Sequence, residues 1–137
     1  MAALSAQVIV LAFVDAINRK DVNRLCELMT DDHLFVDSLG NMVSGKEAMR
    51  KGWIEYFYMT PDFTISCSDV VQNGGLVGLF GVARGTYAVG GKLLDENRWE
   101  IPVAWKAVVR DNLVAEWRVY ADNEPVRRVM AVNTVRR

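Results

Sequence analysis

The stretch HLFVDS, residues 33–38, carries an acid where the alternation of a short strand favours an apolar side chain. Residues two apart on a strand share a face, so Asp37 falls on the same face as Phe35 and His33. A carboxylate on an inward face costs free energy unless a partner accepts it. If apolar walls enclosed Asp37, its carboxylate would suit general-base chemistry, whereas a neighbouring arginine would keep that carboxylate ionised. Asp37 is therefore our leading candidate for acid–base chemistry.

Other kinds of reactive site find little support in the chain. His33 is the only histidine, and we expect it at the surface or at the rim of a pocket. One histidine without clustered cysteine or carboxylate ligands disfavours a zinc site. No GxSxG, CxxC or phosphate-loop motif occurs, and the glycine pairs at 74–75 and 90–91 are typical of turns. We therefore expect neither a metal nor a cofactor.

Length and charge restrict the class of protein. The 137 residues suit a single domain, 1–137, and a net charge of −1 provides no basic field to attract nucleic acid. Cys26 and Cys67 are expected as small buried hydrophobes, because a disulfide scaffold would need more cysteines. We expect a core over about 5–126 and a solvated or frayed tail over 127–137, which holds four arginines, Arg127, Arg128, Arg136 and Arg137.

The N-terminal run MAALSAQVIVLAFVDAINRK has some features of a signal peptide. It lacks a basic start, however, and Gln7 and Asp15 interrupt its apolar residues. It is also too short and too polar to cross a bilayer. We predict an amphipathic helix in a cytoplasmic protein that has no membrane partner and two reduced thiols.

Helices are predicted in the first part of the chain. Apolar residues recur at helical spacing over 4–17 and again over 22–29. Ser44 and Glu47 have the spacing of a capping box, in which each side chain bonds a free backbone N–H of the helix start. This predicts a third helix that ends before Pro61.

Strands dominate the second part, where the apolar period changes to two from Phe63 onward. The Asn-Gly-Gly at 73–75 predicts a hairpin turn, and Arg-Asp-Asn at 110–112 predicts a second tight turn. With the short strand 33–38, the predicted order is ααβαββββ. This order indicates an α+β fold, a cystatin-like cone in which three N-terminal helices pack on a curved, mainly antiparallel sheet. The later strands are expected at 76–88, 98–110 and 113–122.

The alternation between odd- and even-numbered residues predicts which face of the sheet is buried. Odd positions of 98–110 and 113–122 are apolar, so we expect the odd face to meet the helices. Trp105 and Trp117 then share a concave face, which is typical either of a pocket wall or of a bulky core. The even face carries Glu116, Arg118 and Tyr120, and we interpret it either as a dimer interface or as an exposed amphipathic face.

The element order and several segments resemble the nuclear transport factor 2-like superfamily over about residues 5–126. The segments are DAINRKDVNRLCELMTDDHLFVDSLG, GKEAMRKGW and RDNLVAEWRVYADNEP. Within the superfamily, the chain is similar to the SnoaL-like group, the relatives of polyketide cyclases, ketosteroid isomerases and limonene epoxide hydrolases. This resemblance implies a conical apolar cavity and a homodimer. It does not imply one activity, because the fold hosts many chemistries.

The resemblance to ketosteroid isomerases implies that Asp37 is the general base. Their oxyanion-hole tyrosine is matched by Phe13, and no acid lies near Ala104, where the second aspartate would be. A base without either donor could take a proton but could not stabilise the enolate.

The resemblance to limonene epoxide hydrolases matches their arginine with Arg84. At the positions of their two aspartates, this chain has Thr86 and Val119. Phe35 stands in place of their tyrosine, and Asp37 stands in place of their asparagine. The polyketide cyclases rely on an inward acid that the last strand lacks. Asp37 and Arg84, with Thr86, remain as the candidate polar group.

We therefore predict that the homodimer binds a small hydrophobic ligand in its cavity. Asp37 and Arg84 are the candidate catalytic residues, and whether they pair with each other is left open. One hypothesis is a cofactor-independent isomerase, cyclase or lyase acting on a small apolar carbonyl compound, with Asp37 as base. The alternatives are a non-catalytic ligand-binding module and a dimeric structural or partner-binding protein. The candidate lining residues are Phe13, His33, Phe35, Trp53, Phe57, Thr86, Trp105 and Trp117.

Overall fold

The computed structural model describes residues 5–135. Its helices are α1 (Ala6–Arg19), α2 (Val22–Glu27), α3 (Lys46–Met59) and α4 (Glu124–Val135), with a 3₁₀ turn at Asp95–Asn97. Its strands are β1 (Met29–Val36), β2 (Met42–Ser44), β3 (Thr64–Asn73), β4 (Leu76–Thr86), β5 (Arg98–Arg110) and β6 (Leu113–Tyr120). The predicted α+β fold, with helices on a curved sheet, is confirmed.

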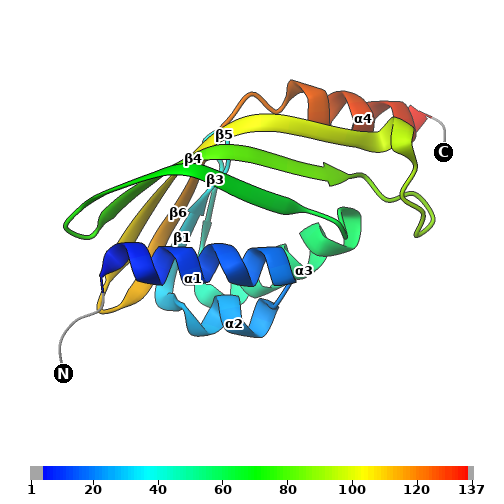
Figure 1. Ribbon diagram of the computed structural model, residues 1–137. Coiled ribbons are helices and arrows are strands. Elements are labelled where there is room, and N and C mark those ends of the chain that lie inside the picture. Colours follow the sequence, from blue (N-terminus) through cyan, green and yellow to red (C-terminus); the bar gives the residue numbers. More distant parts are fainter. Residues whose placement is uncertain (1–4, 136–137) are drawn as a thin grey trace.

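The strands form one six-stranded sheet in the order β2-β1-β6-β5-β4-β3. Neighbouring strands are antiparallel except for β1 and β6, which run parallel. Figure 1 shows α1, α2 and α3 together on one side of the curved sheet and α4 on the other side, along β5. The three N-terminal helices therefore enclose the concave face, and α4 lies outside that enclosure.

α1 is amphipathic and buries one apolar face against the sheet. Asn18 ties its last turn to the edge strand β3: the Asn18 amide N–H donates to the Ile65 carbonyl (3.0 Å), and the Ile65 N–H donates to Asn18 Oδ1 (2.9 Å). This pair satisfies backbone groups that an edge strand would otherwise leave open. The buried residues of α1 are Ala6, Ile9, Val10, Phe13, Val14, Ala16 and Ile17.

The predicted parity holds along β5, whose bounds match the predicted strand 98–110. The side chains at odd positions from Trp99 to Ala107 are buried against the helices. In β6, Trp117 is buried as expected, but a register shift between Val108 and Val109 also turns Val114 inward. A bulge of this kind moves a side chain to the other face, and alternation in the sequence does not reveal it.

Two local features differ from the sequence-based expectation. Ser44 ends β2 instead of capping α3, and α3 begins after Gly45 (φ 102°) without a side-chain cap. The predicted capping box is therefore wrong, because Ser44 pairs with Leu34 in the sheet. Residues 124–135, most of which were expected as a tail, form α4, in which Arg127 and Arg128 pair with Glu124. Arg136 and Arg137 lie outside the described residues.

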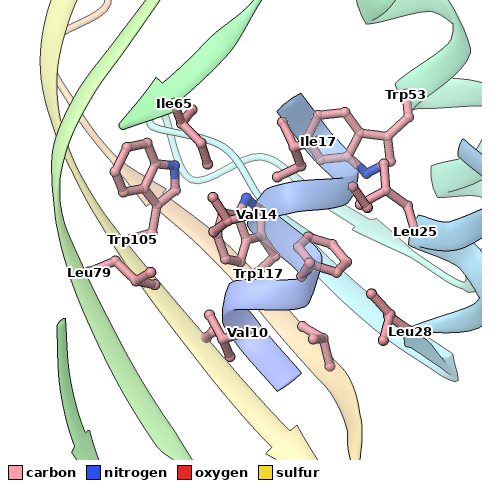
Figure 2. Close-up of a cluster of buried hydrophobic side chains, with 14 of the residues drawn as sticks. Val10, Val14, Ile17, Leu25, Leu28, Trp53, Ile65, Leu79, Trp105 and Trp117 are labelled. Atoms are coloured by element: carbon pink, nitrogen blue, oxygen red, sulfur yellow. The ribbon is translucent and has the colours of Figure 1, made fainter. Parts of the chain in front are cut away.

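The core lies between α1 and the concave face of the sheet. Figure 2 shows Trp105, Trp117 and Leu79 of the sheet facing Val14 of α1. Trp53 of α3 is drawn on the other side of α1, near Ile17. Trp117 is 1 % exposed and Trp105 4 %, so both side chains belong to one continuous hydrophobic cluster. Within residues 5–135, no helix has both the length and the apolarity that crossing a bilayer requires.

Candidate functional site

Two groups of aromatic rings occupy the interior where a ligand cavity was expected. In the first group, the ring of Phe13 lies 5.0 Å from that of Trp117 and 6.0 Å from His33, and Trp105 stacks on Trp117 at 6.2 Å. These contacts join α1, β1, β5 and β6. Such ring pairs add about 0.5–1.5 kcal/mol each beyond the area they bury. This part of the predicted pocket is a packed wall.

The second group lies where α3 packs against β1. Trp53 stacks on Phe57 with ring centroids 5.3 Å apart and meets Phe35 edge-on at 6.5 Å. Trp53 and Phe57 are buried, whereas Phe35 is half-buried. Six predicted aromatic lining residues therefore do converge inside the cone. We call the region between α1, α3 and β1, with Phe13, His33, Phe35, Trp53 and Phe57, the interior site.

His33 is fully buried, which corrects the expectation of a surface or rim histidine. Its Nδ1 lies 2.7 Å from the Val114 carbonyl oxygen. A carbonyl can only accept, so Nδ1 carries the proton and Nε2 keeps a free lone pair. Nε2 is buried and has no hydrogen-bond partner among the described residues. The interior site thus contains one group that can accept a proton or a hydrogen bond.

The irregular pairing of β1 with β6 explains why the sequence pattern did not predict the burial of His33. Between Met29 and Leu34, β1 advances five residues while β6 advances two, from Val114 to Glu116. This irregularity puts His33 inside while Asp31 and Asp32 before it stay exposed. Strict alternation predicted the shared face of His33, Phe35 and Asp37 but not the burial along it.

The indole of Trp53 supplies a hydrogen-bond donor to the interior site, in addition to the acceptor on His33. The Trp53 side chain is 6 % exposed, and its indole Nε1–H is buried without an acceptor among the residues described. Leaving a buried donor unsatisfied costs about 1–3 kcal/mol, so such groups in native proteins usually have a role. The interior site therefore presents one donor and one acceptor among apolar rings.

Asp37 is held outside the interior site by its own turn. Its Oδ1 accepts from the backbone N–H of Leu39 (2.9 Å) and of Asn41 (2.9 Å), and its Oδ2 accepts from Asn41 Nδ2 (3.1 Å). Short acids commonly fold back in this way after a strand. Both oxygens are thus engaged in ordering the β1–β2 turn. The physical conflict that singled out Asp37 is resolved locally.

Arg84 and Thr86 lie on the outer face of the sheet, so the structure does not bring Arg84 together with Asp37. Arg84 Nε is 3.4 Å from Glu100 Oε1, and both side chains are more than half exposed. Thr86 donates from its N–H and its hydroxyl to the two carboxylate oxygens of Asp62, each at 2.7 Å. Odd positions of β4 such as Val77 and Leu79 are buried, so the same parity applied to β4 would have placed Arg84 outside.

Burial lowers the pKa of His33, against the smaller raising effects of the Val114 carbonyl and the carboxylates of Asp32 and Glu116. The folded protein therefore resists protonation that the unfolded chain accepts near pH 6.5. Stability from this group is complete above that pH and falls by up to about 1.4 kcal/mol per unit as the pH drops toward the folded pKa.

The measurement compares urea unfolding of the wild type and His33→Gln from about pH 7.5 to about pH 5.5. Glutamine keeps an N–H for the Val114 carbonyl but does not titrate. We expect the wild type to lose more stability than the variant over this range. Parallel pH profiles would contradict the assignment of a neutral buried imidazole.

Comparisons with known proteins agree with this architecture. The family model described as a SnoaL-like domain matches residues 10–117. No curated protein matches the chain. A protein with a ketosteroid isomerase-like fold from Catenulispora acidiphila, solved with trimethylamine, shares 19% identity at a TM-score of 0.74, with 86% of this chain and 88% of that chain covered.

Two further solved structures cover nearly all of the chain. IdmH from Streptomyces antibioticus, a proposed polyketide cyclase, shares 23% identity at a TM-score of 0.76, with 93% and 99% of the two chains covered. A proposed SnoaL-like polyketide cyclase from Shewanella putrefaciens shares 15% identity at a TM-score of 0.80, with 96% and 99% covered. These identities establish a common fold. The match to the family model over most of the length shows that this chain belongs to the SnoaL-like domain family.

Proposed function

We propose that this SnoaL-like protein binds a small, largely apolar compound with a carbonyl or hydroxyl group in the interior site. The observation that carries the proposal is a pair of buried nitrogens, His33 Nε2 and Trp53 Nε1, which lie among aromatic rings and have no hydrogen-bond partner within residues 5–135. Ligand sites are typically apolar with a few polar groups that orient the ligand. Trp53 would donate to a carbonyl or hydroxyl oxygen, and His33 would accept from a hydroxyl.

In the catalytic form of this proposal, His33 takes the place we expected for Asp37. Its neutral imidazole can receive a proton from a carbon next to the carbonyl, and the Val114 carbonyl would stabilise the proton on Nδ1. This chemistry serves an isomerase, a cyclase or a lyase without a cofactor. In the alternative, the same two nitrogens only orient a ligand and no turnover follows.

The experiment is a thermal-shift screen with cyclic ketones and phenols, followed by ¹H–¹⁵N spectra that resolve the four tryptophan indoles. A ligand that binds only the folded state raises the melting temperature by mass action. We expect the Trp53 indole signal to move, and Trp53→Phe to weaken binding by about tenfold because one hydrogen bond is lost. Trp99→Phe is the matched control.

Two outcomes separate the forms of the proposal. If His33→Gln keeps ligand affinity but loses turnover, the protein is an enzyme with His33 as base. If no compound moves the Trp53 signal at saturating concentration, the interior site is only a core, and the third alternative, a dimeric structural or partner-binding protein, remains.

We also propose that the protein forms a homodimer through the outer face of its sheet. Phe80, Ala104 and Tyr120 lie side by side across β4, β5 and β6. Phe80 is 47% exposed and Tyr120 49%, and Arg118 lies 5.1 Å from the Tyr120 ring. Aromatic residues and arginine are favoured at interface cores. Sedimentation equilibrium should give a dimer that Phe80→Glu dissociates, and a wild-type monomer at high concentration would contradict this.

A further inference from the structure

A hollow of about 320 Å³ lies at the end of the sheet where β3 begins and β4 ends, away from the interior site. It is lined by six residues, Asp62, Arg84, Gly85, Arg98, Trp99 and Glu100. Hollows of this size accommodate small organic molecules.

Strand pairing brings two arginines to this hollow. Arg84 of β4 pairs with Glu100 of β5, and Thr86 pairs with Arg98. Arg84 and Arg98 are therefore diagonal neighbours on the outer face, within reach of one ligand group for long side chains. No signal in the sequence alone joins them, since the pairing register of β4 with β5 decides it.

The two acids of the hollow are already engaged. Both carboxylate oxygens of Asp62 accept from Thr86, each at 2.7 Å. Glu100 faces Arg84 through one contact of 3.4 Å. Among residues 5–135, no carboxylate pairs with Arg98. Within the described part of the chain, the hollow thus has one guanidinium without a carboxylate partner and a second whose ion pair is long.

The floor of the hollow is apolar. Trp99 is 5% exposed, and its ring packs on Phe63 at 6.0 Å. Beside it, Gly85 has no side chain, and a Cβ there would lie 2.4 Å from Thr60 Cγ2 and 3.2 Å from Trp99 Cζ2. A side chain at 85 would therefore point toward the inner face and press on the Trp99 indole.

We propose that this hollow binds a small aromatic carboxylate. The carboxylate of the ligand lies between Arg84 and Arg98, whose planar guanidinium groups can each donate paired hydrogen bonds to a carboxylate. The aromatic ring of the ligand lies toward Trp99, over Gly85. The ligand displaces Glu100 as the partner of Arg84. The two arginines reach this site from the outer face of the sheet, whereas Trp99 borders it from the inner face at the end of the sheet, away from the interior site.

The test is a titration with benzoate, followed through the four indole signals in ¹H–¹⁵N spectra at constant ionic strength. We expect a saturable shift of the Trp99 signal. Arg98→Gln should weaken benzoate binding by about tenfold, because a charge-assisted contact is lost. Glu100→Gln should tighten it by several-fold, because Arg84 is released, as is usual when a competing charge is removed.

Matched controls sit on the same sheet. Arg110→Gln removes a guanidinium at the other end of β5, where it pairs with Asp32, and should leave the affinity unchanged. Glu116→Gln removes a carboxylate paired with Lys106 and serves as the charge control for Glu100→Gln.

Three results would overturn the proposal. They are a Trp99 signal that does not move, equal affinities for all four variants, and weaker binding by Glu100→Gln. A benzoate shift confined to Trp53 would favour the interior site and count against this one. Failure of the ketone and phenol screen at Trp53 would leave the benzoate result unaffected, so the two proposals fail separately.

Discussion

Replacing Gly81 with alanine should lower the free energy of unfolding by about 3 kcal/mol or more. A Cβ at this position would lie 1.8 Å from the backbone oxygen of Ser66 and 2.9 Å from Cys67 Cα. Both atoms are backbone of β3, so no side chain can rotate away. Gly81 pairs with Cys67 next to the register shift between Cys67 and Asp69, and the added methyl group would force β3 and β4 apart.

The measurement is urea unfolding followed by tryptophan fluorescence. Gly52→Ala is the control, because Gly52 lies inside α3 and its nearest neighbour, Met49 Sδ, would be 3.6 Å from the new Cβ. Alanine there should raise stability by up to about 1 kcal/mol through helix propensity. An unchanged midpoint for Gly81→Ala would show that β3 and β4 do not approach this closely.

Truncating Trp117 to alanine should cost about 4 kcal/mol. The Trp117 side chain is 1% exposed and lies between the rings of Phe13 (5.0 Å) and Trp105 (6.2 Å). These two rings cannot both move into the space that the indole would leave. The variant would contain an apolar void of about indole size. Such voids stay dry and accept apolar molecules.

Added indole should therefore restore part of the lost stability of Trp117→Ala and leave the wild type unchanged, as mass action requires for a ligand of the folded state only. Urea midpoints with and without indole provide the measurement. Tyr58→Ala is the control, because the Tyr58 side chain is 83% exposed and should tolerate truncation with little change. A cost below 1 kcal/mol for Trp117→Ala, on the scale of a surface substitution, would show a loosely packed interior.

The proposed interior site contains groups that the sequence analysis named but in different roles. His33, Phe35 and Trp53 were expected to line the pocket, and the structure brings them to the region where β1 and α3 meet α1. Asp37 was expected as the base, yet its turn uses both of its carboxylate oxygens. Which polar atom lacks a partner depends on hydrogen bonds across the fold, and residue types alone do not specify these.

Local rules were sufficient for most of the architecture. Apolar periodicity predicted α1, α2 and the long strands, since each element buries one face whatever its neighbours are. The Asn-Gly-Gly turn after β3 and the Asp-Asn turn after β5 were also readable, because left-handed backbone conformations select these residues. The α+β class followed from the order of these elements.

Features that depend on distant contacts required the tertiary structure. The Asn133 side-chain amide of α4 donates a hydrogen bond to Asn97 Oδ1 (2.9 Å) in the 3₁₀ turn just before β5, and no pattern within residues 124–135 predicts that partner. The parallel pairing of β1 with β6 and its irregular register decided that His33 is enclosed. The register of β4 with β5 decided that Arg84 meets Glu100 and Arg98 outside the cone. Side-chain alternation is a local property of a strand, whereas register and bulges are set by the partner strand, and this is the reason that the sequence by itself determined the fold class but not the site.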